Sequence, residues 1–211
     1  MTSMDAYVGQ TRGGGEAKMH RRLLAADIGE CTCRGELPPR RFPWIYDNGA
    51  YRDWTAGKSF NKDAYLRDLE KLPDITPHPE FIVCPDVVTG GIGSLEFSRS
   101  WLAILPKVSP IFLAVQDGMG TDHVSEVLGE FGGIFVGGSL AWKLKTGHQW
   151  VELAHSRGMK CHIGRVGTAR RVAWARRSRA DSIDSCLPLW SHQNMTKFLG
   201  ALTSRQLEWW M

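Results

Sequence analysis

Short runs of β-branched and aromatic residues recur along the chain, and most are followed by a turn and then by apolar residues at helical spacing. The stretch TDHVSEVLGEFGG shows the helical pattern. A polar capping residue opens it, Val124, Val127, Leu128 and Phe131 share one face, and glycines end it. The stretch SFNKDAYLRDLEKLP is similar and stops at Pro73. The pattern therefore indicates strands that alternate with helices.

This alternation predicts the fold class. We expect strands at residues 6–9, 28–32, 44–46, 81–84, 111–115, 134–136, 160–163 and 182–184. We expect helices at residues 15–26, 62–72, 93–105, 122–131, 141–157, 168–179 and 191–202. Eight such strands favour an α/β fold, a compact TIM-like (β/α)8 barrel, with a doubly wound open sheet as the alternative. No linker divides the chain, so we expect a single domain over residues 1–211.

Composition narrows the class of protein. The chain is 43% hydrophobic and 23% charged, which is ordinary for a globular protein and argues against wholesale disorder. No apolar run approaches the roughly 18 residues of a membrane helix, and the first residues lack the order of a signal peptide. Five cysteines, an odd number, fit a reduced compartment better than a disulfide framework. We therefore expect a cytoplasmic protein without a membrane partner.

Basic residues are concentrated in one part of the chain. The net charge is only +4, but half of the stretch RRVAWARRSR is arginine. Arg170, Arg171, Arg176 and Arg177 lie in this stretch, and Arg165 lies just upstream. Such a cluster attracts phosphates, so we expect these side chains to bind nucleic acid. An ordinary solvated helix face is the alternative interpretation.

Polar residues and glycines follow most of the predicted strands. They are Asp47 in YDNGAY, Asp86 in CPDVVTGG, Gln116 in AVQDG, Gly137 and Gly138 in FVGGS, and Asp184 in ADSIDSCLPLW. Each alone could be a turn former or a surface residue. Sites in parallel α/β folds form at the carboxyl ends of the strands, so we expect these residues to meet at one rim.

These groups suit chemistry on a nucleoside. Two carboxylates that flank a sugar can cleave a glycosidic bond, because one attacks the anomeric carbon while the other handles protons. A carboxylate, a glutamine amide and glycine N–H groups suit the edge of guanine, whose N1–H and amine donate and whose O6 accepts.

From about Trp44 to Pro188 the sequence resembles the tRNA-guanine transglycosylase superfamily, and it looks closest to the small 7-deazaguanine DNA transglycosylases of phages and bacterial modification clusters. YDNGAY resembles the family's Asp-Ser/Thr-Gly-Gly-aromatic motif, AVQDG its Val-Gln-Gly stretch and FVGGS its Gly-Gly segment. GRVGTARRVAWARRSRADSIDSCLP resembles the Gly-Val-Gly-Thr-Pro stretch that leads to the nucleophile motif Phe-Asp-Cys-Val-x-Pro. This last match is the most specific, because two segments occur in the family's order.

The resemblance implies an enzyme that replaces guanine in DNA with a 7-deazaguanine, such as the 7-cyano form, through a covalent Asp–sugar intermediate. It implies Asp184 as the nucleophile, Asp47 as the general acid/base, and Asp86, Gln116, Gly137 and Gly138 as the lining of the base pocket. The implied partners are DNA and the free 7-deazaguanine base, in the host cytoplasm if a phage encodes the protein. No redox cofactor or ATP is needed.

The sequence departs from the family in its metal motif. The tRNA enzymes carry a zinc site after the nucleophile, built from a Cys-x-Cys-x-x-Cys run and a His, whereas only Cys186 and His192 lie in that region here. Cys31 and Cys33 lie too far upstream to replace it and are a weak indication of zinc. We therefore expect no metal or other cofactor.

Three alternatives stay open. A tRNA-guanine transglycosylase-like enzyme would keep the chemistry and change the polymer, although the missing zinc motif and RNA-binding domain argue against it. A non-catalytic nucleic-acid-binding barrel would use only the arginines, although Asp47 and Asp184 are both present. An unrelated barrel hydrolase acting on nucleosides or sugars is the third.

The remaining candidates have weaker patterns. Lys143, shortly after the glycine pair, could meet a phosphate, but we expect it to be an ordinary surface lysine. We assign no role to His148, His155 and His162, whose spacing is not that of metal ligands. The tryptophans at positions 209 and 210 could support a homodimer or pack on their own chain.

Overall fold

Eight parallel strands form one closed barrel, in which neighbours in the chain are neighbours in the sheet and β1 also pairs with β8. The computed structural model of the protein describes residues 4–11 and 17–203, so the predicted start of the first helix lies outside the described residues. The strands are β1 (Asp5–Gly9), β2 (Gly29–Cys33), β3 (Trp44–Asp47), β4 (Ile82–Val83), β5 (Ile111–Val115), β6 (Gly133–Val136), β7 (Lys160–Ile163) and β8 (Ser182–Ser185). The prediction of a TIM-like barrel is confirmed, and the open sheet is excluded by the β1–β8 pairing.

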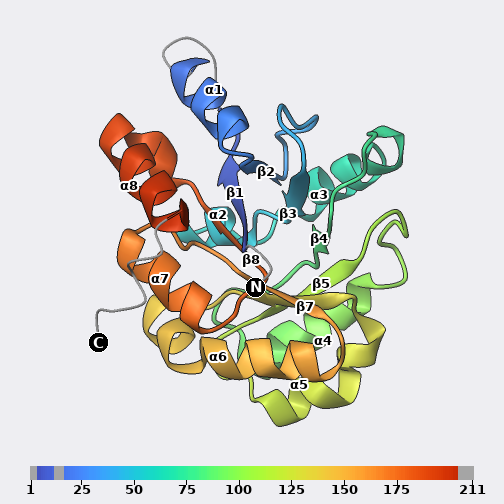
Figure 1. Cartoon of the computed structure of the whole chain (residues 1–211). Coiled ribbons are helices and arrows are strands. Elements are labelled where there is room, and N and C mark those ends of the chain that lie inside the picture. Colours follow the sequence, from blue (N-terminus) through green and yellow to red (C-terminus); the bar gives the residue numbers. More distant parts are fainter. Residues whose placement is uncertain (1–3, 12–16, 204–211) are drawn as a thin grey trace.

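Helices surround this barrel (Figure 1). They are α1 (Ala17–Ala25), α2 (Ala50–Thr55), α3 (Lys62–Leu69), α4 (Gly91–Trp101), α5 (Thr121–Val127), α6 (Leu140–Ser156), α7 (Ala169–Arg177) and α8 (His192–Thr203), with 3₁₀ turns η2 (Leu72–Asp74), η3 (Leu128–Glu130) and η4 (Leu187–Trp190). The alternation has one irregularity. A loop, residues 34–43, joins β2 to β3, whereas both α2 and α3 follow β3.

Several elements differ from the sequence prediction. Helix α4 ends at Trp101 and not at residue 105, and α5 ends at Val127 and not at residue 131. Helix α2 is not predicted, because six residues are too few to show a period; it follows Gly49, whose φ of 76° turns the chain out of β3. The pattern predicts four residues for β4, but the strand has two. The N–H of Cys84 still donates to the carbonyl of Phe112 at 2.9 Å, but Pro85 has no N–H, so the ladder ends there.

Two apolar clusters define the inside and the outside of the barrel. One consists of residues on or beside strands: Tyr7, Cys31, Ile45, Phe81, Val83, Phe112, Ala114 and Phe135. The other combines alternate strand positions, such as Val8 and Trp44, with helix residues such as Leu23 and Trp150. Because successive residues of a strand face opposite sides, the first cluster is the barrel interior and the second is the layer beneath the helices.

A buried ion pair secures the part of the barrel that lacks a helix. Arg41 Nη1 lies 3.3 Å from Glu30 Oε2, and both side chains are fully buried. Arg41 Nη2 also donates to the carbonyls of Val8 at 2.7 Å and Gly9 at 3.0 Å. The pair therefore connects β1, β2 and the loop of residues 34–43.

We expect Arg41→Met to lower the free energy of unfolding by about 3–5 kcal/mol, because it leaves the Glu30 carboxylate buried without its partner. The double variant Glu30→Gln/Arg41→Met removes both charges and should recover more than half of this loss. Urea unfolding followed by circular dichroism measures both. Equal losses in the two variants would show that the unpaired charge is not the cause.

Candidate active site

The inward-facing positions of the barrel become polar at the carboxyl ends of the strands. Ile45, Ala114 and Phe135 face the interior, and so does Ser182, which contacts the buried His162. The residues two positions further along these strands are Asp47, Gln116, Gly137 and Asp184. Asp86 and Gly138 lie in the loops that follow β4 and β6. The structure thus brings all the predicted catalytic and base-binding residues to one end of the barrel. We call this set, Asp47, Asp86, Gln116, Gly137, Gly138 and Asp184, the site rim.

Asp47 is the last residue of β3 and is half-buried. Its Oδ1 accepts a hydrogen bond from the backbone N–H of Gly49 at 2.6 Å. Burial raises the pKa of Asp47 to about 6, and the nearby charge of Asp184 adds to this increase. Asp47 can therefore either hold or release a proton near neutral pH, as a general acid/base must.

Asp184, on β8, is 7% exposed. Its Oδ1 accepts from the backbone N–H of Arg165 at 3.3 Å and lies 2.9 Å from Nε2 of His162. Within the described residues no donor reaches its Oδ2. One oxygen of this carboxylate is thus held by the protein while the other is available to a ligand.

Asp86 is the centre of a buried amide network. Its Oδ1 accepts from Asn48 Nδ2 at 2.8 Å, and its Oδ2 accepts from Gln116 Nε2 at 2.6 Å. Gln116 Oε1 in turn accepts from the backbone N–H of Gly138 at 3.0 Å. Burial raises the pKa of Asp86 to about 7, although both amides favour the charged form. The network fixes the orientation of each group. Because burial outweighs the amide hydrogen bonds, both the neutral and the charged form of Asp86 are populated at neutral pH.

The two glycines of the rim are required by this geometry. A Cβ at Gly137 would lie 2.5 Å from Gln116 Nε2, so any side chain there would displace the glutamine. Gly138 has a φ of 69°, a conformation that side chains disfavour. Glycine at both positions therefore allows the backbone of the β6 loop to approach Gln116.

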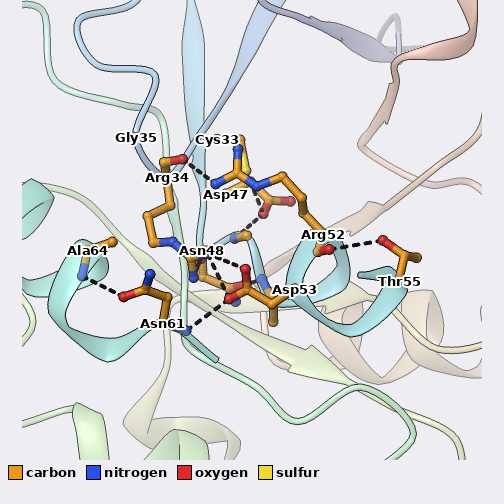
Figure 2. A network of polar contacts seen from close by, with 12 residues as sticks. Cys33, Arg34, Gly35, Asp47, Asn48, Arg52, Asp53, Thr55, Asn61 and Ala64 are labelled. Carbon is orange, nitrogen blue, oxygen red and sulfur yellow. Dashed lines mark hydrogen bonds and ion pairs between the residues drawn. The ribbon is translucent and has the colours of Figure 1, made fainter. Parts of the chain in front are cut away.

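A second polar network supports the loop after β3 (Figure 2). Arg34 Nη2 donates to both carboxylate oxygens of Asp53, at 2.6 and 2.7 Å, and Arg34 Nη1 donates to the carbonyl of Asn48 at 3.2 Å. Asp53 Oδ2 also accepts from the backbone N–H of Asn61 at 2.9 Å. These residues anchor α2 beside the end of β3, where Asp47 lies. No local motif in the sequence links Arg34 to Asp53, so this network could not be predicted from the sequence.

Arg165 lies over the rim. Its guanidinium donates to the carbonyl of Gly138 and stands 3.9 Å from the ring centroid of Tyr51. Tyr51 stacks on Trp54, with centroids 5.8 Å apart, and both rings are exposed. The structure therefore places Arg165 beside the predicted base pocket, with an aromatic pair next to it. Its prediction as a nucleic-acid contact stays a prediction.

The four arginines of α7 have different surroundings. Arg170 and Arg177 are exposed, and Arg171 is half-buried. Arg176 is also half-buried, and its Nη1 donates to the carbonyls of Ala201 and Leu202 in α8, both at 3.4 Å. The cluster is therefore not one uniform face: Arg176 connects two helices, whereas Arg170 and Arg177 face solvent.

Two buried residues near the rim were not predicted from the sequence. The prediction of Lys143 at the surface is wrong: it is 2% exposed, and its Nζ donates to the carbonyl of Gly164. Burial, with the charge of Arg165, lowers the pKa of Lys143 to about 7. His162, to which we assigned no role, is fully buried against Asp184. His162 lies on β7, two residues before Gly164, which follows the strand. Because alternate residues of a strand face the same side, this spacing indicates that the His162 side chain faces the barrel interior.

The described ranges, 4–11 and 17–203, hold no group of three or more His, Cys, Asp or Glu side chains placed to bind a metal ion. Cys33, on β2, is half-buried, and its Sγ lies 3.9 Å from Asp47 Oδ1. In the same ranges, no helix has both the length and the apolar character that crossing a membrane requires. The tryptophans at positions 209 and 210 lie outside the described residues.

No protein-family model matches the chain, and no curated protein matches it significantly.

The raised pKa of Asp86 links its protonation to stability. Between pH 4 and pH 7 the folded protein retains a proton that the unfolded chain, with a carboxyl pKa of 3.8, has released. The folded state is therefore weakened as the pH rises through this window. Asp86→Asn cannot titrate, so relative to the wild type it should gain about 4 kcal/mol between pH 4 and pH 8.

Urea unfolding at a series of pH values measures this difference. Asp63→Asn, at an exposed position of α3, is the matched control and should give a difference that does not vary with pH. If the free energy of unfolding changed with pH in the same way in the wild type and in Asp86→Asn, the raised pKa of Asp86 would be contradicted.

Proposed function

We propose that this protein is a DNA base-exchange enzyme, a glycosyltransferase that replaces guanine with a 7-deazaguanine through a covalent intermediate on Asp184. One observation carries the proposal: the catalytic pair Asp47 and Asp184 adjoins the buried network of Asp86, Gln116 and Gly138 at the mouth of one barrel. The order of the motifs along the chain, which resembles that of the transglycosylase superfamily, supports the same assignment.

The first displacement uses the two catalytic carboxyls. Oδ2 of Asp184 attacks C1′ of the guanine nucleotide, the C1′–N9 bond breaks, and a sugar–Asp184 ester forms. The bonding electrons leave with guanine, which takes a proton from Asp47. A carboxyl with a pKa of about 6 can supply this proton and recover it later.

The second displacement reverses the first with a different base. The 7-deazaguanine enters, the Asp47 carboxylate removes its N9 proton, and N9 attacks C1′. The ester bond breaks and returns the electron pair to Asp184. Two inversions at C1′ retain the configuration of the sugar, and no redox cofactor or ATP is consumed.

The amide network matches the edge of the base that both guanine and 7-deazaguanine present. The Asp86 carboxylate accepts from N1–H and the exocyclic amine, since each of its oxygens has a lone pair beyond the one used by Asn48 or Gln116. When the base binds, its O6 would replace Gln116 Oε1 as the acceptor of the Gly138 N–H. Recognition of N1–H requires the charged form of Asp86.

DNA is the polymer that the residues favour. The segment after Asp184 lacks the cysteine run of the tRNA enzymes, with only Cys186 and His192 present. The exposed Arg170 and Arg177 can contact phosphates. A guanine inside a duplex is unreachable, so the base must be flipped out, at a cost of a few kcal/mol. The exposed rings of Tyr51 and Trp54 can stack on nucleobases near the mouth.

Base exchange with radiolabelled guanine tests the reaction, with duplex DNA and bulk tRNA offered in parallel. We expect label to enter DNA but not tRNA. Asp184→Asn, which retains an oxygen acceptor but loses the nucleophile, should abolish incorporation, and Asp47→Asn should lower it by about 100-fold or more. Asp63→Asn, at an exposed position of α3, is the control outside the rim. Label in tRNA alone would move the protein to the tRNA alternative, and DNA binding without exchange would favour the non-catalytic barrel.

The arginines of α7 give a separate prediction about DNA binding. Arg170→Ala and Arg177→Ala should each reduce the slope of log Kd against log salt concentration by about 1, because each removes a phosphate contact. Arg176→Ala should leave the slope unchanged and lower Tm, because it breaks contacts with α8. Fluorescence anisotropy and thermal unfolding measure the two effects. If only Arg176→Ala reduced the slope, Arg176 would be the residue that contacts phosphate, and Arg170 and Arg177 would not.

A further inference from the structure

A histidine lies inside the barrel in direct contact with the proposed nucleophile. His162 is on β7 and is fully buried. Its Nε2 lies 2.9 Å from Oδ1 of Asp184, and its Nδ1 lies 2.8 Å from Oγ of Ser182. Ser182 and Asp184 are both on β8, and His162 is in register with Ser182. The three side chains form a row in which each contacts the next.

The two partners decide which ring nitrogen carries the proton. A carboxylate only accepts hydrogen bonds, so Nε2 of His162 carries the hydrogen and donates to Asp184. The hydroxyl of Ser182 then donates to the unprotonated Nδ1. Burial lowers the pKa of His162, which favours a neutral ring with a single N–H.

Aromatic side chains prevent the imidazole from turning. The ring of Phe135 stacks on it, with centroids 4.9 Å apart and planes 14° from parallel. Phe81 contacts it at 5.2 Å and Tyr7 at 6.1 Å between centroids. The N–H of His162 therefore points in one direction only, and that direction is fixed by the packed interior of the barrel.

This arrangement makes the two oxygens of Asp184 unequal. Oδ1 accepts from His162 and from the backbone N–H of Arg165, whereas Oδ2 accepts from none of the described residues. A carboxylate free to rotate would lose part of its reactivity to unproductive orientations.

We propose that His162 is a positioning residue for Asp184, whose Nε2–H holds Oδ1 and thereby selects Oδ2 as the atom that attacks C1′. This role rests on the proposed function, in which Asp184 is the nucleophile. When the Oδ2–C1′ bond forms and the C1′–N9 bond breaks, Oδ1 becomes the ester carbonyl and still accepts from His162. When the new N9–C1′ bond forms and the ester bond breaks, the same N–H stabilises the returning carboxylate charge.

His162→Phe tests this role, because phenylalanine suits the aromatic interior but donates no hydrogen bond. We expect kcat for base exchange to fall about 10- to 100-fold, the effect of losing a hydrogen bond to a charged group. KM for the free base should stay unchanged, because Asp86, Gln116 and Gly138 are untouched. His162→Gln, whose amide donates, should recover most of the lost rate.

Two further variants keep the test decisive if His162→Phe folds poorly. Ser182→Ala removes only the hydroxyl that fixes the tautomer, and it should lower kcat by a smaller factor than His162→Phe. His155→Gln is the matched control. His155 also pairs with an aspartate, with its Nε2 2.9 Å from Asp181 Oδ2, but Asp181 precedes β8 at the opposite end of the barrel. This control should leave kcat unchanged.

Nitrogen-15 spectra of labelled histidine provide a readout that does not depend on activity. The wild type should show His162 as the neutral Nε2–H tautomer, and Asp184→Ala should lose the hydrogen-bonded proton signal. An Nδ1–H tautomer in the wild type would overturn the positioning role directly.

The outcomes separate the two proposals. A wild type that exchanges bases while His162→Phe retains its full kcat overturns the positioning role and leaves the proposed function intact. A loss of kcat that His162→Gln does not recover, with KM altered as well, shows a merely structural histidine. A folded wild type that exchanges no base in any polymer overturns the proposed function, and the positioning role with it.

Discussion

The closure of the barrel is the constraint on which the rest of the structure depends. Once β1 pairs with β8, every second residue of eight strands must share one narrow interior. Aromatic rings fill the part of this interior near the amino ends of the strands, where Phe81 and Phe112 stack with centroids 4.0 Å apart. The carboxyl groups of Asp47 and Asp86 stand above this apolar packing, which keeps water from one side of them. Their raised pKa values follow from that position.

Neutral donors, and not cations, hold the carboxyl groups of the rim. Asp86 accepts from two side-chain amides, and Asp47 accepts from a backbone N–H. A close guanidinium would keep a carboxyl charged at all working pH values, whereas an amide stabilises the charge only in part. Sites in which carboxyls have distinct protonation behaviour are typical of acid–base chemistry. The fully charged ion pairs, such as Arg34 with Asp53, support the loops from outside the rim.

Periodicity in the sequence predicted alternating strands and helices and favoured a closed barrel over an open sheet. The residues at the strand ends then predicted the polar rim, because the carboxyl ends of parallel strands meet where the barrel closes. Periodicity was not enough for His162. A lone histidine in an apolar strand shows only which way it faces, and its contact with Asp184 depends on the register between β7 and β8. Lys143 illustrates another limit. It lies on α6, where the helical period leaves open how deeply a long side chain reaches. Helix α2 was too short to leave a pattern.

Arg165 contacts both Asp184, on β8, and Gly138, in the loop after β6. Its backbone N–H donates to Asp184, while its guanidinium donates to the carbonyl of Gly138 and covers Tyr51. Its φ of 61° is unusual for a residue with a side chain, and this backbone conformation directs its N–H toward Asp184. The contact with Tyr51 is made by the side chain and the hydrogen bond to Asp184 by the backbone, so a molecule that stacks on Tyr51 can move the guanidinium while the N–H stays in place. A single arginine therefore offers the site a fixed N–H donor and an adjustable cation.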